Sequence, residues 1–155
     1  MRRSRLLAAL LVGLLGLLAL GLRVQAQSAT PTAGALATHP LVGAWVLDTN
    51  ADDPSTPPTL TSSSADGIYT QVEQGNAVGI GSWTATGLAT ANLTFHELVT
   101  DPKGDVVGYF TVRASITVAA DGQTLTATYT LEYPAGNGQT TGQYGPGRVT
   151  GIRVG

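Results

Sequence analysis

The chain has 155 residues, no cysteine and a formal charge of −2 at pH 7. The absence of cysteine excludes disulfides, on which many small secreted domains depend. The four basic residues beyond position 26 are scattered, which excludes the clustered basic surface that nucleic acids and anionic membranes require.

The first 26 residues have the layout of a secretory signal peptide. Arg2, Arg3 and Arg5 precede an uncharged run of Leu, Ala, Gly and Val from Leu6 to Leu22, and small or polar residues surround Ala26. We therefore predict an exported protein. It would be either extracellular or located in the cell envelope, in the periplasm or at the cell surface. Cleavage after Ala26 would leave four basic and ten acidic residues, a formal charge of −6. An uncleaved N-terminal anchor is the alternative.

Residues 27–40 form a segment without periodicity, rich in Ser, Ala, Thr, Pro and Gly. Such a composition is typical of a flexible linker. The domain is expected to span residues 41–155, a length that suffices for one hydrophobic core. No long apolar run follows the first segment, so we expect no membrane insertion of the mature chain.

From Leu41 onward, apolar and polar residues alternate with a period of two, which is typical of strands. Turn signals such as Asp66-Gly67, Asp121-Gly122 and Asn137-Gly138 separate the alternating segments. About eight strands are expected, over residues 41–47, 60–64, 68–73, 77–86, 91–99, 108–118, 124–133 and 139–154. Consecutive hairpins with one apolar face predict an all-β fold, an eight-stranded antiparallel up-and-down β-barrel. A two-sheet β-sandwich is the alternative.

The first of these segments reads Leu41-Val42-Gly43-Ala44-Trp45. Its Gly-x-Trp resembles the start of the first strand in lipocalins and fatty-acid-binding proteins, the calycin-type barrels. The resemblance implies a minimal, bacterial form of the lipocalin-like barrel, in which Trp45 closes one end and a basic residue of the final strand lies across its indole. Such a contact is worth ~0.5–2 kcal/mol. Arg148 is the expected partner, because Arg153 is so near the terminus; a plain core role for Trp45 is the alternative.

The alternation also predicts an interior ligand surface. An eight-stranded barrel is either filled by its own side chains or holds one small ligand. We predict a secreted, non-enzymatic barrel that binds a small apolar or amphipathic molecule, and filling by side chains is the alternative. The inward residues expected to bind the ligand are Phe95, Phe110, Val112, Tyr129 and Leu131.

Glu97 is a carboxylate on an otherwise apolar face of its strand. In a dry interior its pKa would rise and it could act as an acid or base. That would suit an isomerase or cyclase similar to allene oxide cyclases, with Tyr109 or Tyr129 as other proton-transfer groups. We expect instead that Glu97 lies at the barrel rim in water, since charged residues usually stay exposed. A surface interaction module tethered by an uncleaved N-terminus is a further alternative.

No metal site or cofactor is predicted. His39 and His96 are the only histidines, and neither has a second histidine at ligand spacing. Both are expected to face solvent. The stretch Asp48–Asp52 has the acidic spacing of a calcium loop, but Asp53 replaces the required glycine and Thr59 replaces the glutamate.

Overall fold

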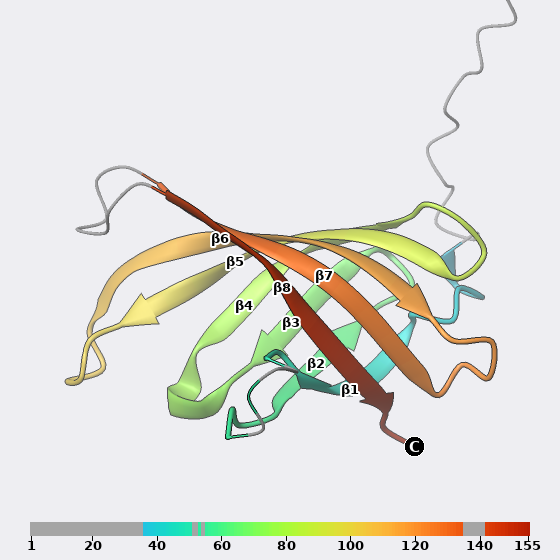
Figure 1. Cartoon of the computed structure of the whole chain (residues 1–155), viewed down its shortest axis with the longest axis horizontal. Coiled ribbons are helices and arrows are strands. Elements are labelled where there is room, and N and C mark those ends of the chain that lie inside the picture. The colour runs from blue at the N-terminus through green and yellow to red at the C-terminus, as the bar shows by residue number, and fades with distance from the viewer. Residues whose placement is uncertain (1–35, 51–52, 54, 135–141) are drawn as a thin grey trace, which may run out of the picture. The chain divides into compact units, whose positions relative to one another are not determined.

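The computed structural model describes residues 36–50, 53, 55–134 and 142–155. Within them, eight antiparallel strands follow one another in chain order and close into a barrel (Figure 1). The strands are β1 (Gly43–Asp48), β2 (Thr59–Ser63), β3 (Ile68–Val72), β4 (Val78–Ala85), β5 (Thr90–Thr100), β6 (Val106–Val118), β7 (Thr124–Tyr133) and β8 (Gly142–Arg153), with a short 3-10 turn, η1 (Gln74–Asn76), between β3 and β4.

Closure of the barrel depends on pairing between the first and last strands. Trp45 of β1 lies opposite Arg153 of β8, and Asp48 lies opposite Thr150. The predicted up-and-down β-barrel is therefore confirmed, and the β-sandwich is excluded. The predicted signal peptide, residues 27–35 of the predicted linker and the Asn137-Gly138 turn lie outside the described residues. Within the described ranges, no helix combines the length and apolar character needed to span a membrane.

On β2 and β3, polar residues face the interior. Tyr69 and Gln71 of β3 are buried, whereas Leu60 and Val72 are 58% and 49% exposed on the outside. The alternation of two is present, but it is inverted relative to the usual apolar core. The inward side chains of β2 are likewise polar, namely Thr59, Thr61 and Ser63.

One end of the barrel is covered by the residues that precede β1. Leu36 and Leu41 are buried in the core, and His39 is only 7% exposed. The His39 ring lies 5.1 Å from that of Trp83, and its Nδ1 accepts a hydrogen bond from the Leu41 amide at 3.1 Å. The expectation that His39 faces solvent is thus wrong. Leu36 and His39, which lie within the predicted linker, are therefore packed against the barrel.

Trp45 closes this same end, and Arg153 is the basic residue across it. The Trp45 indole is 1% exposed and donates a hydrogen bond to the Leu41 carbonyl at 2.9 Å. The Arg153 guanidinium carbon lies 4.3 Å from the centroid of the indole. The prediction of Arg148 is wrong because the period of two places Arg148 on the outer face, whereas Val149 and Arg153 share the inner one.

Gly43 allows the guanidinium to lie this close to β1. Its φ of +136° lies in a region that side chains other than glycine rarely adopt, and a Cβ there would collide with the Arg153 guanidinium. The Gly-x-Trp pattern therefore has two roles at this end. The glycine gives the arginine room, and the tryptophan provides the aromatic surface on which it packs.

Candidate functional site

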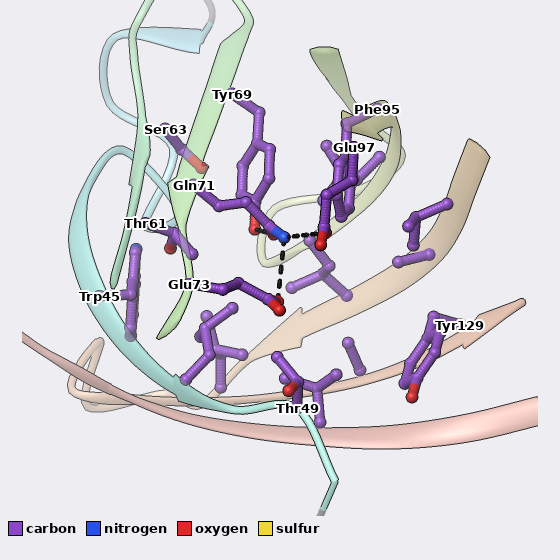
Figure 2. Close-up of a pocket in the computed structure, with 18 of the residues that line it drawn as sticks. Trp45, Thr49, Thr61, Ser63, Tyr69, Gln71, Glu73, Phe95, Glu97 and Tyr129 are labelled. Carbon is purple, nitrogen blue, oxygen red and sulfur yellow. Dashed lines mark hydrogen bonds between the residues drawn. The ribbon is translucent and has the colours of Figure 1, made fainter. Parts of the chain in front are cut away.

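The barrel encloses a cavity of about 200 Å³ (Figure 2). All five side chains predicted to bind a ligand line it: Phe95, Phe110, Val112, Tyr129 and Leu131. The interior is thus only partly filled by side chains. Room arises partly from small inward residues, since Ala114 of β6 and Ala127 of β7 also line the cavity.

β4 contributes no lining residue, because two of its inward positions are glycines. Gly79 lies opposite Glu97 of β5, and Gly81 lies opposite Phe95. A Cβ on Gly81 would collide with the Thr94 carbonyl and with Phe95 itself. The glycines therefore allow β5 and its aromatic ring to pack directly on the β4 backbone, a close approach that side chains would prevent.

The cavity has one apolar wall and one polar wall. The apolar wall comes from β6, β7, β8 and β1, with residues such as Val112, Ile116, Leu125, Leu131 and Val149. The polar wall comes from β2, from β3 and the residue after it, and from one residue of β5, with Thr61, Ser63, Tyr69, Gln71, Glu73 and Glu97. The other lining residues of β5, Leu93 and Phe95, are apolar. An interior with two such walls matches molecules that are themselves apolar on one side and polar on the other.

Gln71 is the centre of the polar wall (Figure 2). Its side-chain nitrogen donates to Glu97 at 2.6 Å and to Glu73 at 3.1 Å, and its oxygen accepts a hydrogen bond from the Tyr69 hydroxyl at 2.8 Å. Glu73 also accepts a hydrogen bond from the Thr59 hydroxyl at 3.2 Å. One amide thus holds two carboxylates beside the same cavity.

Glu97 lies inside the barrel rather than at its rim. Its side chain is 6% exposed, and β5 continues for three further residues to Thr100. The period of two places it on the inner face with Leu93 and Phe95. The expectation of a water-exposed carboxylate is therefore wrong. Gly79 on β4 leaves space for the Glu97 side chain, and the Gln71 amide hydrogen-bonds to it. Alternation along β5 alone cannot predict these neighbours, because they lie on other strands.

Burial raises the pKa of Glu97 from 4.5 to about 7, and the nearby charge of Glu73 adds to this effect. The Gln71 hydrogen bond acts in the opposite direction. Burial and the Glu73 charge also raise the pKa of the Tyr129 phenol across the cavity. No lysine, arginine or histidine is among the described residues that line the cavity, so the carboxylates have no counterion there.

Glu97→Gln is expected to make the protein more stable at pH 8. The raised pKa means that the folded state binds this proton more tightly than the unfolded state, so stability falls as pH rises from 4.5 to about 7. The shift corresponds to about 3 kcal/mol, which screening at the open end of the cavity reduces to about 1–2 kcal/mol. Urea unfolding at several pH values measures the gain, which should vanish below pH 4.5.

The matched control for this substitution is Glu132→Gln on the outer face. Glu132 pairs with Arg113 at 3.1 Å, and both side chains are well exposed. Surface ion pairs contribute about 0–1 kcal/mol, so this variant should be no more stable than the wild type. Equal pH profiles for the Glu97→Gln variant and the wild type would contradict the buried, charge-destabilised state of Glu97.

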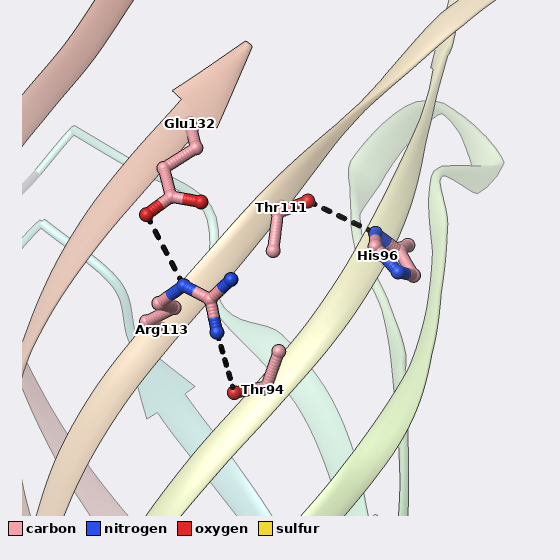
Figure 3. A network of polar contacts seen from close by, with 5 residues as sticks. All are labelled: Thr94, His96, Thr111, Arg113 and Glu132. Carbon is pink, nitrogen blue, oxygen red and sulfur yellow. Dashed lines mark hydrogen bonds and ion pairs between the residues drawn. The ribbon is translucent and has the colours of Figure 1, made fainter. Parts of the chain in front are cut away.

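The other polar residues that the sequence analysis considered, His96 and Tyr109, lie on the outer face of the barrel. Figure 3 shows the polar contacts around His96 there. His96 is exposed as expected, and its Nδ1 lies 3.0 Å from the Thr111 hydroxyl. Tyr109 is 39% exposed on this side, so of the two tyrosines named for proton transfer only Tyr129 lines the cavity. Among the described residues no three potential ligands gather to hold a metal ion; Ala51 and Asp52 of the calcium-like stretch lie outside them.

Sequence reasoning did not single out Ser63, Gln71 or Glu73. The only local signal is that Gln71 and Glu73 share a face with the aromatic Tyr69. Comparison with protein-family models, curated proteins and solved structures yields no match to this chain. The function therefore has to be inferred from the cavity and its two walls.

Proposed function

We propose that this chain is an exported, non-enzymatic barrel of lipocalin-like type that binds a small amphipathic molecule in its interior. The observation that supports this best is the cavity of about 200 Å³ between an apolar and a polar wall. The contact of Gly43, Trp45 and Arg153 at one end supports the lipocalin-like kinship. The apolar N-terminal run supports export.

The size of the cavity limits the ligand. An apolar cavity of about 150 Å³ holds benzene, whereas sites for drug-sized molecules occupy about 300–1,000 Å³. A cavity of about 200 Å³ therefore suits a single ring with one short substituent, or a short chain. Longer molecules would have to project from the barrel.

Access is expected at the end opposite Trp45. The Trp45 end is covered by Leu36, Leu41 and Arg153. At the other end, Glu73 and Tyr129 line the cavity and are half-buried. A ligand that enters there meets the carboxylates of the polar wall first.

An isomerase or cyclase, similar to allene oxide cyclases, is the second candidate function. The specific observation in its favour is Glu97, a buried carboxyl beside the cavity whose pKa of about 7 suits proton transfer at neutral pH. If the protein turns over a substrate and Glu97→Gln abolishes that turnover, the enzymatic function is established. Binding without turnover supports the non-enzymatic one.

Filling the cavity provides the direct test of ligand binding. Ala114 faces the cavity from β6, whereas its neighbour Ser115 is exposed on the outside. We expect Ala114→Leu to abolish stabilisation by benzyl alcohol, and Ser115→Leu to leave it intact. A ligand at 100 times its dissociation constant stabilises the folded state by about 2.7 kcal/mol, a gain of several degrees in Tm. If Ala114→Leu leaves the binding of benzyl alcohol unchanged, the ligand binds outside the cavity.

A further inference from the structure

We infer that the cavity selects ligands with a cationic nitrogen, small primary amines whose ammonium group lies between Glu73 and Glu97. This inference rests on the proposed binding function and names the ligand class. Figure 2 shows the carboxylates of Glu73, just after β3, and of Glu97, on β5, approaching the same amide. The carboxylates come together only through tertiary structure, since 24 positions separate them along the chain.

The first argument is the unused hydrogen-bonding capacity of the carboxylates. The Gln71 amide has two N–H groups and donates to Glu97 and Glu73. Thr59 donates to the same Glu73 oxygen as Gln71 does. Among the described residues, nothing donates a hydrogen bond to the second oxygen of either carboxylate. An ammonium group has three N–H donors and no acceptor, which matches the two free carboxylate oxygens.

The second argument is the absence of a protein counterion. The groups that face Glu97 are Gln71 and Glu73 from β3 and its end, Gly79 from β4 and Phe110 from β6. Tyr69 and Tyr129 complete the titratable groups of the cavity lining. Removing carboxylates from water is costly unless a positive charge pairs with them. A cationic ligand supplies that charge.

The described basic residues all lie elsewhere. Arg113 and Arg148 are exposed on the outer face, and Lys103 is in the turn between β5 and β6. Arg153 donates at the closed end to the carbonyls of Gly122 at 2.7 Å and Val42 at 2.9 Å. None of these cations lines the cavity.

Ser63 is an independent sign that the polar wall receives a ligand. Its side chain is 2% exposed and lines the cavity, and its Oγ has no hydrogen-bond partner among the described residues. Nearly all buried hydroxyls in native proteins are hydrogen-bonded, so an orphaned one calls for a partner that is not part of the chain. Ser63 lies beside Tyr69 on the wall that also holds Gln71. A ligand in the cavity can supply that partner.

Three probes of nearly equal size and different charge test the inference. Calorimetric titration at pH 8 compares benzylammonium, benzyl alcohol and benzoate. Hydrogen bonds to charged groups justify an expected preference of about 10- to 100-fold for benzylammonium over benzyl alcohol. Benzoate is expected to bind more weakly than benzyl alcohol, because it would meet two carboxylates. An alcohol that binds as tightly as the amine overturns the inference and leaves the binding function standing.

Substitutions identify the groups responsible. Glu97→Gln and Glu73→Gln should each reduce the preference for the amine at least fivefold without weakening benzyl alcohol binding, whereas the outer-face control Glu132→Gln should leave it unchanged. If one variant does not fold, as judged by circular dichroism, the other still decides. An amine preference that both variants retain overturns the inference. Failure of all three probes to bind overturns the proposed function as well.

The pH dependence provides a readout that a structural role would not change. Glu97 takes up a proton as pH falls through about 7, so the affinity for benzylammonium should drop about tenfold or more between pH 8 and pH 5. The Glu97→Gln variant should show a flatter profile. Identical profiles for wild type and variant overturn the assignment to Glu97.

Discussion

Arg153→Met is expected to lower the free energy of unfolding by about 3 kcal/mol. The guanidinium of Arg153 donates to the carbonyls of Pro40, Val42 and Gly122 and lies over the Trp45 ring. Its removal leaves these half-buried carbonyls without a donor and the indole without its cation. Urea or thermal unfolding measures the loss.

Arg148→Met is the matched control, because Arg148 is exposed on the same strand and faces outward. Its effect should stay within about 0.5 kcal/mol. Arg153→Lys should recover only part of the lost stability, since an ammonium cannot reach three carbonyls in the planar geometry of a guanidinium. Equal losses of unfolding free energy from Arg148→Met and Arg153→Met would contradict the stabilising contact of Arg153 with Trp45 and the nearby carbonyls.

Gly81→Ala is expected to destabilise the barrel by about 3 kcal/mol. The added Cβ would collide with the Thr94 carbonyl and with the backbone of Phe95. A backbone cannot move aside as a flexible side chain can, so β4 would have to separate from β5. Thermal unfolding followed by circular dichroism measures the effect.

Gly79→Ala and Ser82→Ala are the comparison variants for Gly81→Ala, with a smaller loss of stability expected at Gly79 and almost none at Ser82. A Cβ at Gly79 would lie 2.7 Å from Gln71 Cγ and 2.9 Å from the Phe95 ring. These side chains can shift, so a smaller loss of about 1–2 kcal/mol is expected. Ser82 is exposed, and its truncation should be almost neutral. Equal effects at Gly81 and Ser82 would mean that β5 does not pack on the β4 backbone as described.

The cavity-lining residues of β5, β6 and β7 were predictable because these strands are long and regular. On β5, β6 and β7 the apolar residues share one face, so Phe95, Phe110, Val112, Tyr129 and Leu131 could be placed in the interior from alternation alone. Barrel closure then brings those faces around one cavity. Local pattern suffices where the face that is apolar is also the face that is buried.

The polar wall was not predictable in this way. On β2 and β3 the sequence offers two plausible faces, and the apolar one, with Leu60 and Val72, points outward. Alternation defines two faces but does not say which one closes on the core. That choice depends on how β2 and β3 pair with β1 and β4, a long-range property of the sheet.

By itself, the sequence determined about eight strands of an all-β fold and most of the apolar lining, because these depend on local periodicity. Closure of one end at Trp45 was implied only by the resemblance of Gly43-Ala44-Trp45 to lipocalins, and the pairing of β1 with β8 decided that the strands form a barrel rather than a sandwich. Only the tertiary structure decided that Arg153 rather than Arg148 meets the indole, since the β1–β8 register selects it. Only the structure placed Glu97 in the interior beside Gln71 and Glu73, because contacts between strands distant in sequence surround it. The carboxylates on which ligand choice is proposed to depend are therefore a product of barrel closure.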